Sequence, residues 1–350
     1  MEKKTHQYKI QLEYFSLLLF FFFWANILFA QNKQYILALS KGDSSLIVLD
    51  YQTLKAIKSI PISSDPHEIV TNREGTEAYI SHPVLTGIGS KINVVDLKNL
   101  NLKRTIDTKP FYTPHGLSFQ SNKLWVTVQG SKAVVLLDLK TDRVEQVFGT
   151  GQDFTHLISV RNDGLAFYTT NVESGTVSVY EKKDIAPYMP PTGVLPPNAK
   201  MRSEWRQDLI EVGLGAEGFD ISRDGKELWT ARPDGHIIVV DLEKKLVKHD
   251  INSGVLGLHR LKITPDGNSV CIVSVKTGEL LYYNRATLQF MQKQKIGRGA
   301  GIFMDAEQDR MFISCTPDNY IAVIDLKSRQ EIKRISIARP DGVTAVEVLK

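Results

Sequence analysis

The chain of 350 residues has 43 basic and 39 acidic side chains, is 42% hydrophobic and carries a formal charge of +4. This composition is typical of a folded globular protein, and it excludes a disordered chain and a miniprotein that depends on disulfides. No basic block interrupts the mixture of charges, so no nucleic-acid partner is expected, and two cysteines are too few for a disulfide framework.

The N-terminal residues have the order of a secretory signal peptide. Three lysines precede an apolar run from Phe15 to Ala30. The run is short for a membrane span of about 20 residues, and Ala30 fits a cleavage site although Leu28 is larger than the favoured residue. We expect residues 1–30 to be removed and residues 31–350 to be exported, to the periplasm or outside the cell, with no remaining membrane span. An uncleaved anchor is the alternative.

After residue 34 one short pattern recurs about every 41 residues. It consists of a small or polar anchor residue, apolar residues two and four positions later, a turn, and an aliphatic run that ends in Asp. Four-stranded units of this length are typical of propeller blades. The seven anchors are His67, His115, His156, Glu217, His259, Ala300 and Asp341.

The unit that starts at Glu217 shows the pattern most clearly. FDIS predicts an inner strand, Asp224-Gly225 predicts a hairpin turn, and KELWTA, HIIVVDL and KKLVKHDI predict the next three strands. An aspartate ends most of the predicted third strands, the unit with Glu181 being an exception. It can accept a hydrogen bond from the backbone two residues on, so we assign it to turn formation and not to catalysis. These aspartates are Asp96, Asp138, Asp241 and Asp325.

The two ends of the chain complete one further unit. Only one strand, GVTAVEV, follows Asp341, and three strands, QYILALS, SLIVLDY and LKAIKSI, precede His67. Pairing the C-terminal strand with the three N-terminal strands leaves no exposed sheet edge. The predicted fold class is therefore all-β: one domain over residues 31–350, a seven-bladed β-propeller of four-stranded antiparallel blades.

Units such as PHGLSFQSNKLWVTVQGSKAVVLLDLKTDRV and DGKELWTARPDGHIIVVDLEKKLV resemble the YVTN or YncE-type propeller repeats, over residues 35–350. The resemblance implies the fold and no single chemistry. The architecture is similar to that of lactonases, quinoprotein amine dehydrogenase heavy chains, nitrous oxide reductase and haem d1 domains, which share no active site. We find no clear lactonase signature, and the sequence contains no HExxH, GxSxG or Gly-rich phosphate motif.

The anchors begin the inner strands, so they are expected to form a ring around one mouth of the central channel, which we call the top mouth. Two loops on the same face would add His82, Phe111 and Tyr112. Convergent polar groups beside aromatic surface suit ligand recognition. We expect a small molecule, or a protein or peptide, to bind there without covalent chemistry. The candidate ring residues are His67, His115, His156, Glu217, His259 and Asp341.

Two other roles for this ring remain open. Four imidazoles, those of His67, His115, His156 and His259, suit Cu, Zn or Fe, and nitrous oxide reductase resembles this arrangement. An enzyme would then use Glu217 and Asp341 as further ligands or as an acid–base pair. Alternatively the ring is only structural. One of its seven positions is Ala300, whose side chain cannot coordinate a metal ion.

Residues 182–207 form a proline-rich insertion between the third and fourth strands of one unit, on the opposite face. It could present Tyr188, Met189 and Trp205 to a partner, but we expect it to pack along the blade edge.

Cys271 and Cys315 lie in neighbouring second strands, three residues out of register, or about 10 Å apart along the strand direction. That separation is too long for a disulfide, so we expect two buried free thiols. The protein is expected to be a monomer.

Overall fold

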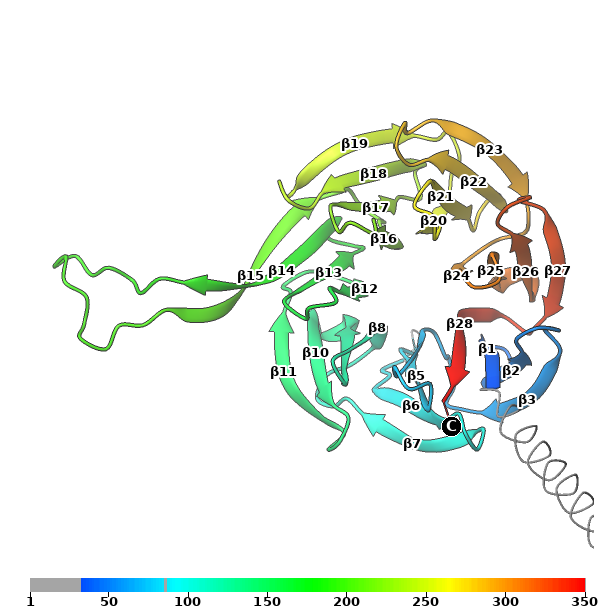
Figure 1. Cartoon of the computed structure of the whole chain (residues 1–350), viewed down its shortest axis with the longest axis horizontal. Helices are drawn as coiled ribbons and strands as arrows, with labels where there is room; N and C mark the ends of the chain where they lie inside the picture. Colours follow the sequence, from blue (N-terminus) through cyan, green and yellow to red (C-terminus); the bar gives the residue numbers. More distant parts are fainter. Residues whose placement is uncertain (1–32, 85–86, 350) are drawn as a thin grey trace, which may run out of the picture.

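The computed structural model describes residues 33–84 and 87–349, which form seven four-stranded antiparallel sheets around a central channel (Figure 1). The predicted fold class is confirmed. The predicted signal peptide, residues 1–30, lies outside the described residues. No helix within the described ranges is long and apolar enough to cross a membrane.

The blades are numbered from the first anchor, His67. Blade 1 contains β4 (Ile69–Thr71), β5 (Glu77–His82), β6 (Lys91–Asp96) and β7 (Asn101–Asp107). Blade 2 contains β8 (Pro114–Gln120), β9 (Lys123–Val128), β10 (Ala133–Asp138) and β11 (Arg143–Gly149). Blade 3 contains β12 (Thr155–Val160), β13 (Ala166–Asn171), β14 (Thr176–Ile185) and β15 (Arg202–Glu211). Blade 4 contains β16 (Phe219–Ile221), β17 (Glu227–Ala231), β18 (His236–Asp241) and β19 (Leu246–Asn252).

Blade 5 contains β20 (Leu258–Ile263), β21 (Ser269–Ser274), β22 (Glu279–Asn284) and β23 (Phe290–Lys295). Blade 6 contains β24 (Gly301–Asp305), β25 (Arg310–Cys315), β26 (Tyr320–Asp325) and β27 (Glu331–Ser336). Blade 7 contains β28 (Pro340–Val348), β1 (Lys33–Ser40), β2 (Ser45–Asp50) and β3 (Ala56–Pro61). Two short 3₁₀ turns, η1 (Gln129–Ser131) and η2 (Thr316–Asp318), follow β9 and β25.

Blade 7 closes the ring as predicted. Its inner strand β28 comes from the C-terminus and pairs antiparallel with β1, with Lys33 opposite Val348 and Leu37 opposite Thr344. Two strand edges that would otherwise be exposed are thereby paired.

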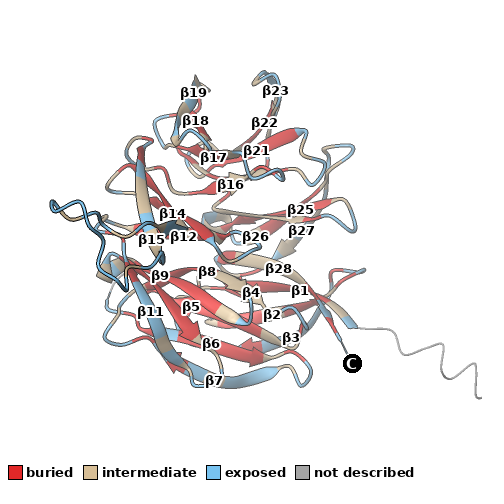
Figure 2. Ribbon diagram, turned by 60° about the vertical axis from the view of Figure 1, so that its left-hand side comes forward, coloured by how far each residue is buried: buried red, intermediate tan, exposed pale blue. Residues whose placement is uncertain are grey.

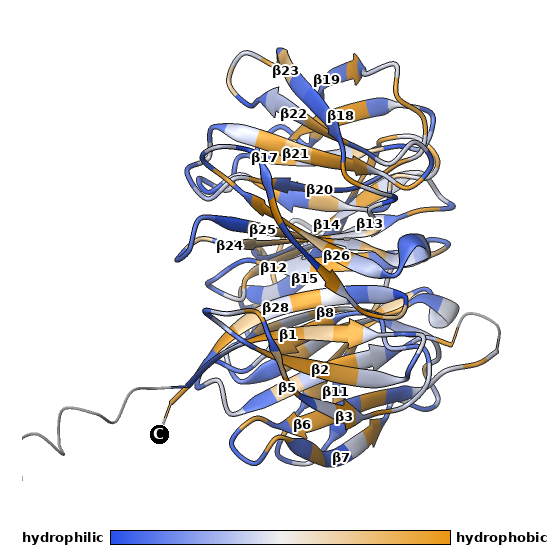
Figure 3. Ribbon diagram, turned by 90° about the vertical axis from the view of Figure 1, so that its right-hand side faces the viewer, coloured by the Kyte–Doolittle hydropathy of each residue, from blue (hydrophilic) through white to orange (hydrophobic). Residues whose placement is uncertain are grey.

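The apolar core lies between neighbouring blades. The middle strands are buried on both faces and the outer strands are largely exposed (Figure 2). The sequences show why: β21 reads SVCIVS, with four apolar residues in its middle, whereas β23 reads FMQKQK and ends in four consecutive polar residues (Figure 3). A disc built in this way is rigid, and it holds the seven inner strands at fixed positions around the channel.

Two predictions about single residues are confirmed. The Asp96 and Asp138 carboxylates accept hydrogen bonds of 2.8 Å from the backbone N–H two residues on, at Lys98 and Lys140. Cys271 and Cys315 are buried and unbridged. Burial raises the pKa of each thiol to about 12.

The insertion of blade 3 forms a hairpin arm that extends β14 and β15 outward from the rim of the disc (Figure 1). Trp205 packs against the rings of Trp125 and Phe148 at the base of the arm, as the packing interpretation requires. At the tip, Tyr188 is 76% and Met189 54% exposed. The prediction that the insertion packs along the blade edge is therefore wrong for the tip.

Candidate functional site

The structure brings the predicted ring residues together at the top mouth, where three imidazoles contact one another in a row. The ring centroids of His67 and His115 are 4.5 Å apart, and those of His115 and His156 are 4.0 Å apart; the rings of each pair are tilted by 49° and 41°. His115 and His156 belong to the inner strands of blades 2 and 3, and His67 lies two residues before the inner strand of blade 1, so the row bridges three separate sheets.

Carboxylates continue the row at both ends. Asp341 Oδ2 lies 3.1 Å from His67 Nδ1. At the other end, Glu217 lies between two imidazoles: Oε1 is 3.2 Å from His156 Nε2, and Oε2 is 2.9 Å from His259 Nε2. The second nitrogen of His259 donates to the Ala300 carbonyl at 3.1 Å. All seven anchors therefore take part in one chain of contacts, Ala300 through its backbone.

Close packing of the inner strands explains how these side chains meet. The residue after the anchor is glycine in four of the seven blades. A Cβ at Gly116 would lie 2.4 Å from the His156 carbonyl oxygen, and one at Gly342 would lie 2.7 Å from the His67 carbonyl oxygen. Thr127 then donates from the second strand of blade 2 to the same His156 carbonyl at 2.5 Å. At Gly116 and Gly342 a side chain would therefore clash with the backbone of the neighbouring anchor.

Four residues of this cluster were missed by the sequence analysis: Lys41, Asp65, Glu68 and Arg260. Lys41 lies just after β1, and its ammonium is 3.0 Å from Asp341 and 3.3 Å from Asp65. Arg260 donates to Glu68 at 2.9 Å. The sequence does contain a signal for Glu68 and Arg260. Each directly follows an anchor, at the position where four other blades have glycine. We call these four residues, together with the six predicted ring residues, the mouth cluster.

The two nitrogens of the His67 ring face groups of opposite charge. Nε2 contacts the Lys41 ammonium, and Nδ1 lies 3.1 Å from Asp341 Oδ2 without a hydrogen bond between them. Burial lowers the pKa of His67, and this effect outweighs the opposing charge of Asp341. The ring is therefore neutral at neutral pH.

His115 and His156 are more buried than expected for side chains at a channel mouth. They are 1% and 2% exposed, whereas the core residue Ile158 is 8% exposed. Burial holds the pKa of His115 well below its usual range and lowers that of His156 to about 3, although Glu217 opposes the second shift. The Nδ1 atoms of both rings and the Nε atom of Arg260 have no hydrogen-bond partner among the described residues.

The two carboxylates nearest Arg260 respond differently to burial. Burial alone would raise the pKa of Glu217, but His259, His156 and Arg260 outweigh it and hold that pKa well below its usual range. For Glu68 burial prevails over the attraction of Arg260, and the pKa is raised. The cluster thus contains one carboxylate whose pKa is lowered beside another whose pKa is raised.

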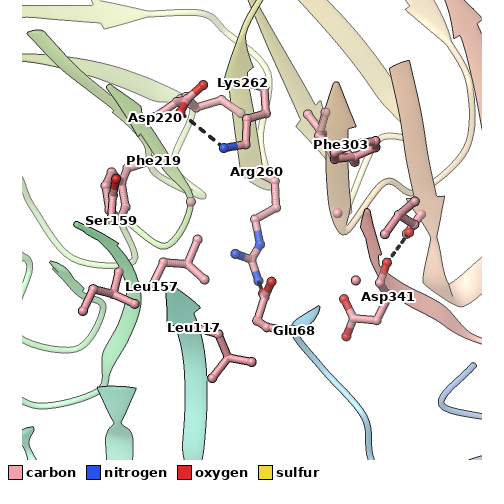
Figure 4. Close-up of a pocket in the computed structure, with 18 residues that line it drawn as sticks. Glu68, Leu117, Leu157, Ser159, Phe219, Asp220, Arg260, Lys262, Phe303 and Asp341 are labelled. Atoms are coloured by element: carbon pink, nitrogen blue, oxygen red, sulfur yellow. Dashed lines mark hydrogen bonds and ion pairs between the residues drawn. The ribbon is translucent and has the colours of Figure 1, made fainter. Parts of the chain in front are cut away.

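A cavity of about 210 Å³ continues from the mouth cluster into the channel (Figure 4). Glu68, Arg260 and Asp341 belong both to the mouth cluster and to the cavity wall. Further along the inner strands Lys262 contacts Asp220 at 3.2 Å. The remaining wall is partly apolar, with Leu117, Leu157, Phe219 and Phe303 among its residues.

Three predicted site residues lie outside the mouth cluster. His82 is fully buried, with Nδ1 3.0 Å from the Ser64 carbonyl, and it lines a separate surface pocket. Burial lowers the pKa of His82 to about 4. Phe111 packs into the core between blades 1 and 2, and Tyr112 is partly exposed. The two loops therefore do not bring these side chains to the ring.

The arrangement of the ring residues does not match the alternative in which the four histidines bind a metal ion. Within residues 33–84 and 87–349, no group of three or more His, Cys, Asp or Glu side chains is arranged to hold a metal ion. The nitrogens of His67 and His259 face protein groups, and the rings of His67, His115 and His156 contact one another side by side instead of directing nitrogens to a common point.

No protein-family model matches the sequence, and no curated protein matches it. Solved structures are similar in fold at low identity. The putative 6-phosphogluconolactonase of Bacteroides uniformis has a TM-score of 0.69 and 14% identity, over 90% of this chain and 100% of that one. A protein of unknown function from Desulfotomaculum acetoxidans has a TM-score of 0.70 and 9% identity, over 89% and 99%. Kuenenia stuttgartiensis hydrazine synthase has a TM-score of 0.64 and 14% identity, over 81% and 95%. The chain is a β-propeller, and identities this low show the fold alone.

Proposed function

We propose that this protein is an exported propeller of the YVTN/YncE type that binds a small molecule at the top mouth of its channel, and that the ligand carries an ammonium group. The excess of negative charge in the mouth cluster carries the proposal. Counting carboxylates, Lys and Arg among the described residues, the cluster has four carboxylates and two cations. The carboxylates are Asp65, Glu68, Glu217 and Asp341.

This excess favours a cationic ligand because the cluster is poorly solvated. Arg260 is 8% exposed and Asp341 6%. Coulombic attraction is several times stronger in such surroundings than in water. A ligand ammonium placed between Glu68 and Asp341 would bring the charges of the site closer to balance.

The size and lining of the cavity restrict the rest of the ligand. The cavity of about 210 Å³ suits a small molecule or one inserted side chain. The apolar wall at Leu117 and Phe219 suits a short hydrocarbon segment between the polar groups.

A thermal-shift comparison of three matched probes tests the charge preference. Ethanolamine, ethylene glycol and glycolate share a hydroxyl and differ in being cationic, neutral and anionic. At equal ionic strength we expect only ethanolamine to raise Tm in a concentration-dependent manner, since a ligand at about 100 times its Kd stabilises the folded state by about 2.7 kcal/mol.

Two isosteric variants locate the effect. Glu68→Gln removes a carboxylate of the cavity and should abolish the ethanolamine shift. Glu279→Gln removes a carboxylate that pairs with Lys293 on the outside of blade 5, and it should leave the shift intact. A larger shift with glycolate than with ethanolamine would refute the proposed ligand class.

Export is the second part of the proposal, and it is supported by the apolar run that ends at Ala30. Mass spectrometry of the protein from its native host should find an N-terminus at Gln31. An intact Met1 on membrane-bound protein would instead assign the segment as an anchor.

A further inference from the structure

The hairpin arm of blade 3 is unlike the equivalent connection in every other blade. In the other six blades, four or five residues join the third strand to the fourth. Here residues 186–201 join β14 to β15, and no residue between 182 and 203 is buried. Loops of this length without regular structure are uncommon in compact domains, and many of them are functional.

The tip of the arm exposes large apolar side chains. The exposed fractions are 76% for Tyr188, 54% for Met189, 71% for Val194 and 60% for Met201. Between Ile185 and Met201 the only charged residue is Lys200. Exposed apolar groups gathered in this way are typical of surfaces that contact a protein or a membrane.

Prolines reduce the number of backbone donors in the tip. Five of its residues are prolines, which have no N–H: Pro187, Pro190, Pro191, Pro196 and Pro197. Two other N–H groups are satisfied within the tip, since Gly193 donates to Pro190 and Ala199 to Pro196, each at 2.9 Å. Lipid offers no acceptors deep in the bilayer, so each N–H that is absent or satisfied lowers the cost of entering its boundary. A protein partner can offer acceptors and imposes no such cost.

Basic residues flank the tip. Residues 182–207 contain five Lys or Arg and two acidic residues, a net charge of +3. Lys182 and Lys200 lie on the two sides of the tip, which is where a headgroup layer would meet an inserted loop. Anionic lipids attract such residues, by about 1 kcal/mol per Lys or Arg near the surface.

We propose that the arm inserts its apolar tip into the headgroup region of a membrane that contains anionic lipids. Tyr188 suits this boundary because its ring is apolar and its hydroxyl is polar. The inference is independent of the ligand site, since the arm projects from the rim of the disc and the ligand site lies at the channel (Figure 1).

Co-sedimentation with vesicles tests the proposal. Residues 31–350 are used, because they contain every strand of the ring and lack the N-terminal apolar run, which would bind lipid by itself. The protein should sediment with vesicles of phosphatidylcholine and phosphatidylglycerol, and more weakly with phosphatidylcholine alone. Replacing Tyr188, Met189 and Val194 together by Ser should lower the partition coefficient at least about tenfold.

Matched variants distinguish insertion of the tip from nonspecific hydrophobic binding to the vesicles. The combined change Leu246→Ser, Phe290→Ser and Ile332→Ser removes apolar side chains that are about half exposed on the outer strands, and should leave binding unchanged. Lys182→Gln with Lys200→Gln should weaken binding to the anionic vesicles only. Tm of the tip variant should match that of the wild type, since its side chains are exposed. A wild-type chain that stays in the supernatant with both vesicles, as a protein-docking arm would, overturns the proposal, and so does binding that survives the tip variant.

Discussion

At the scale of single residues, the mouth cluster is notable for burying imidazoles almost completely. His115 and His156 are less exposed than the apolar Ile158, so the mouth is filled by side chains instead of being an open polar rim. Replacing both histidines by Ala would therefore leave a cavity and should destabilise the protein. This burial could not be predicted from the sequence, because the sequence gives the order of the anchors but not the distance between the inner strands.

The burial of His156 predicts a pH dependence of stability. The unfolded chain binds a proton near pH 6.5, whereas the pKa of this ring in the folded state is about 3. Between these values the unfolded state binds more protons, so the free energy of unfolding decreases as pH falls from about 6.5 towards 3. Urea denaturation should show a shallower decrease for His156→Asn than for the wild type.

His249→Asn is the matched control for that measurement, because His249 lies on the outer strand β19. It should keep the wild-type slope. Equal slopes for His156→Asn and the wild type would mean that His156 is not the neutral, buried ring described above.

At the scale of elements, the site depends on the spacing of the inner strands. Glycine after the anchor allows neighbouring strands to approach, and the charged residues at the same position in blades 1 and 5, Glu68 and Arg260, reach each other across the channel. The repeat made the anchors predictable because equivalent positions in each blade face the same mouth. Lys41 and Asp65 come from segments outside the repeated positions, so no pattern in the sequence pointed to them.

Two glycine substitutions test this spacing. Gly116→Ala would place a Cβ 2.4 Å from the His156 carbonyl oxygen, so the strands must separate, at a cost of about 1–3 kcal/mol. Gly301→Ala places its Cβ no closer than 3.5 Å to any atom and should be neutral or slightly stabilising. The free energies of unfolding in urea measure both, and a similar effect of the two changes would argue against close strand packing as the basis of the site.

At the scale of the whole molecule, ring closure makes stability depend on the last strand. Val346 and Val348 of β28 pack with Leu37 and Leu39 of β1 in the core between blades 7 and 1. The sequence predicted this closure because one strand at the C-terminus and three at the N-terminus add up to a blade. It did not predict the direction of the hairpin arm, since prolines stiffen a loop without specifying what it contacts.

Deleting residues 340–350 should therefore cause unfolding or aggregation, because the deletion exposes the edge of β1 and uncovers apolar side chains. Replacing residues 187–200 by Gly-Gly removes a longer segment and should leave a monomer with unchanged Tm, since that segment contains no buried residue. Size-exclusion chromatography with thermal melting distinguishes the two. A C-terminal truncation that melts like the wild type would contradict the closure.

The proposed function requires the mouth cluster to be a cation-selective ligand site. Isothermal titration calorimetry of residues 31–350 with ethanolamine measures this directly, in the wild type and in Glu68→Gln and Asp341→Asn. We predict one site per chain in the wild type and a loss of binding in both variants with folding preserved. No heat from the wild type, or equal affinity in all three proteins, would mean that the mouth cluster is not this ligand site.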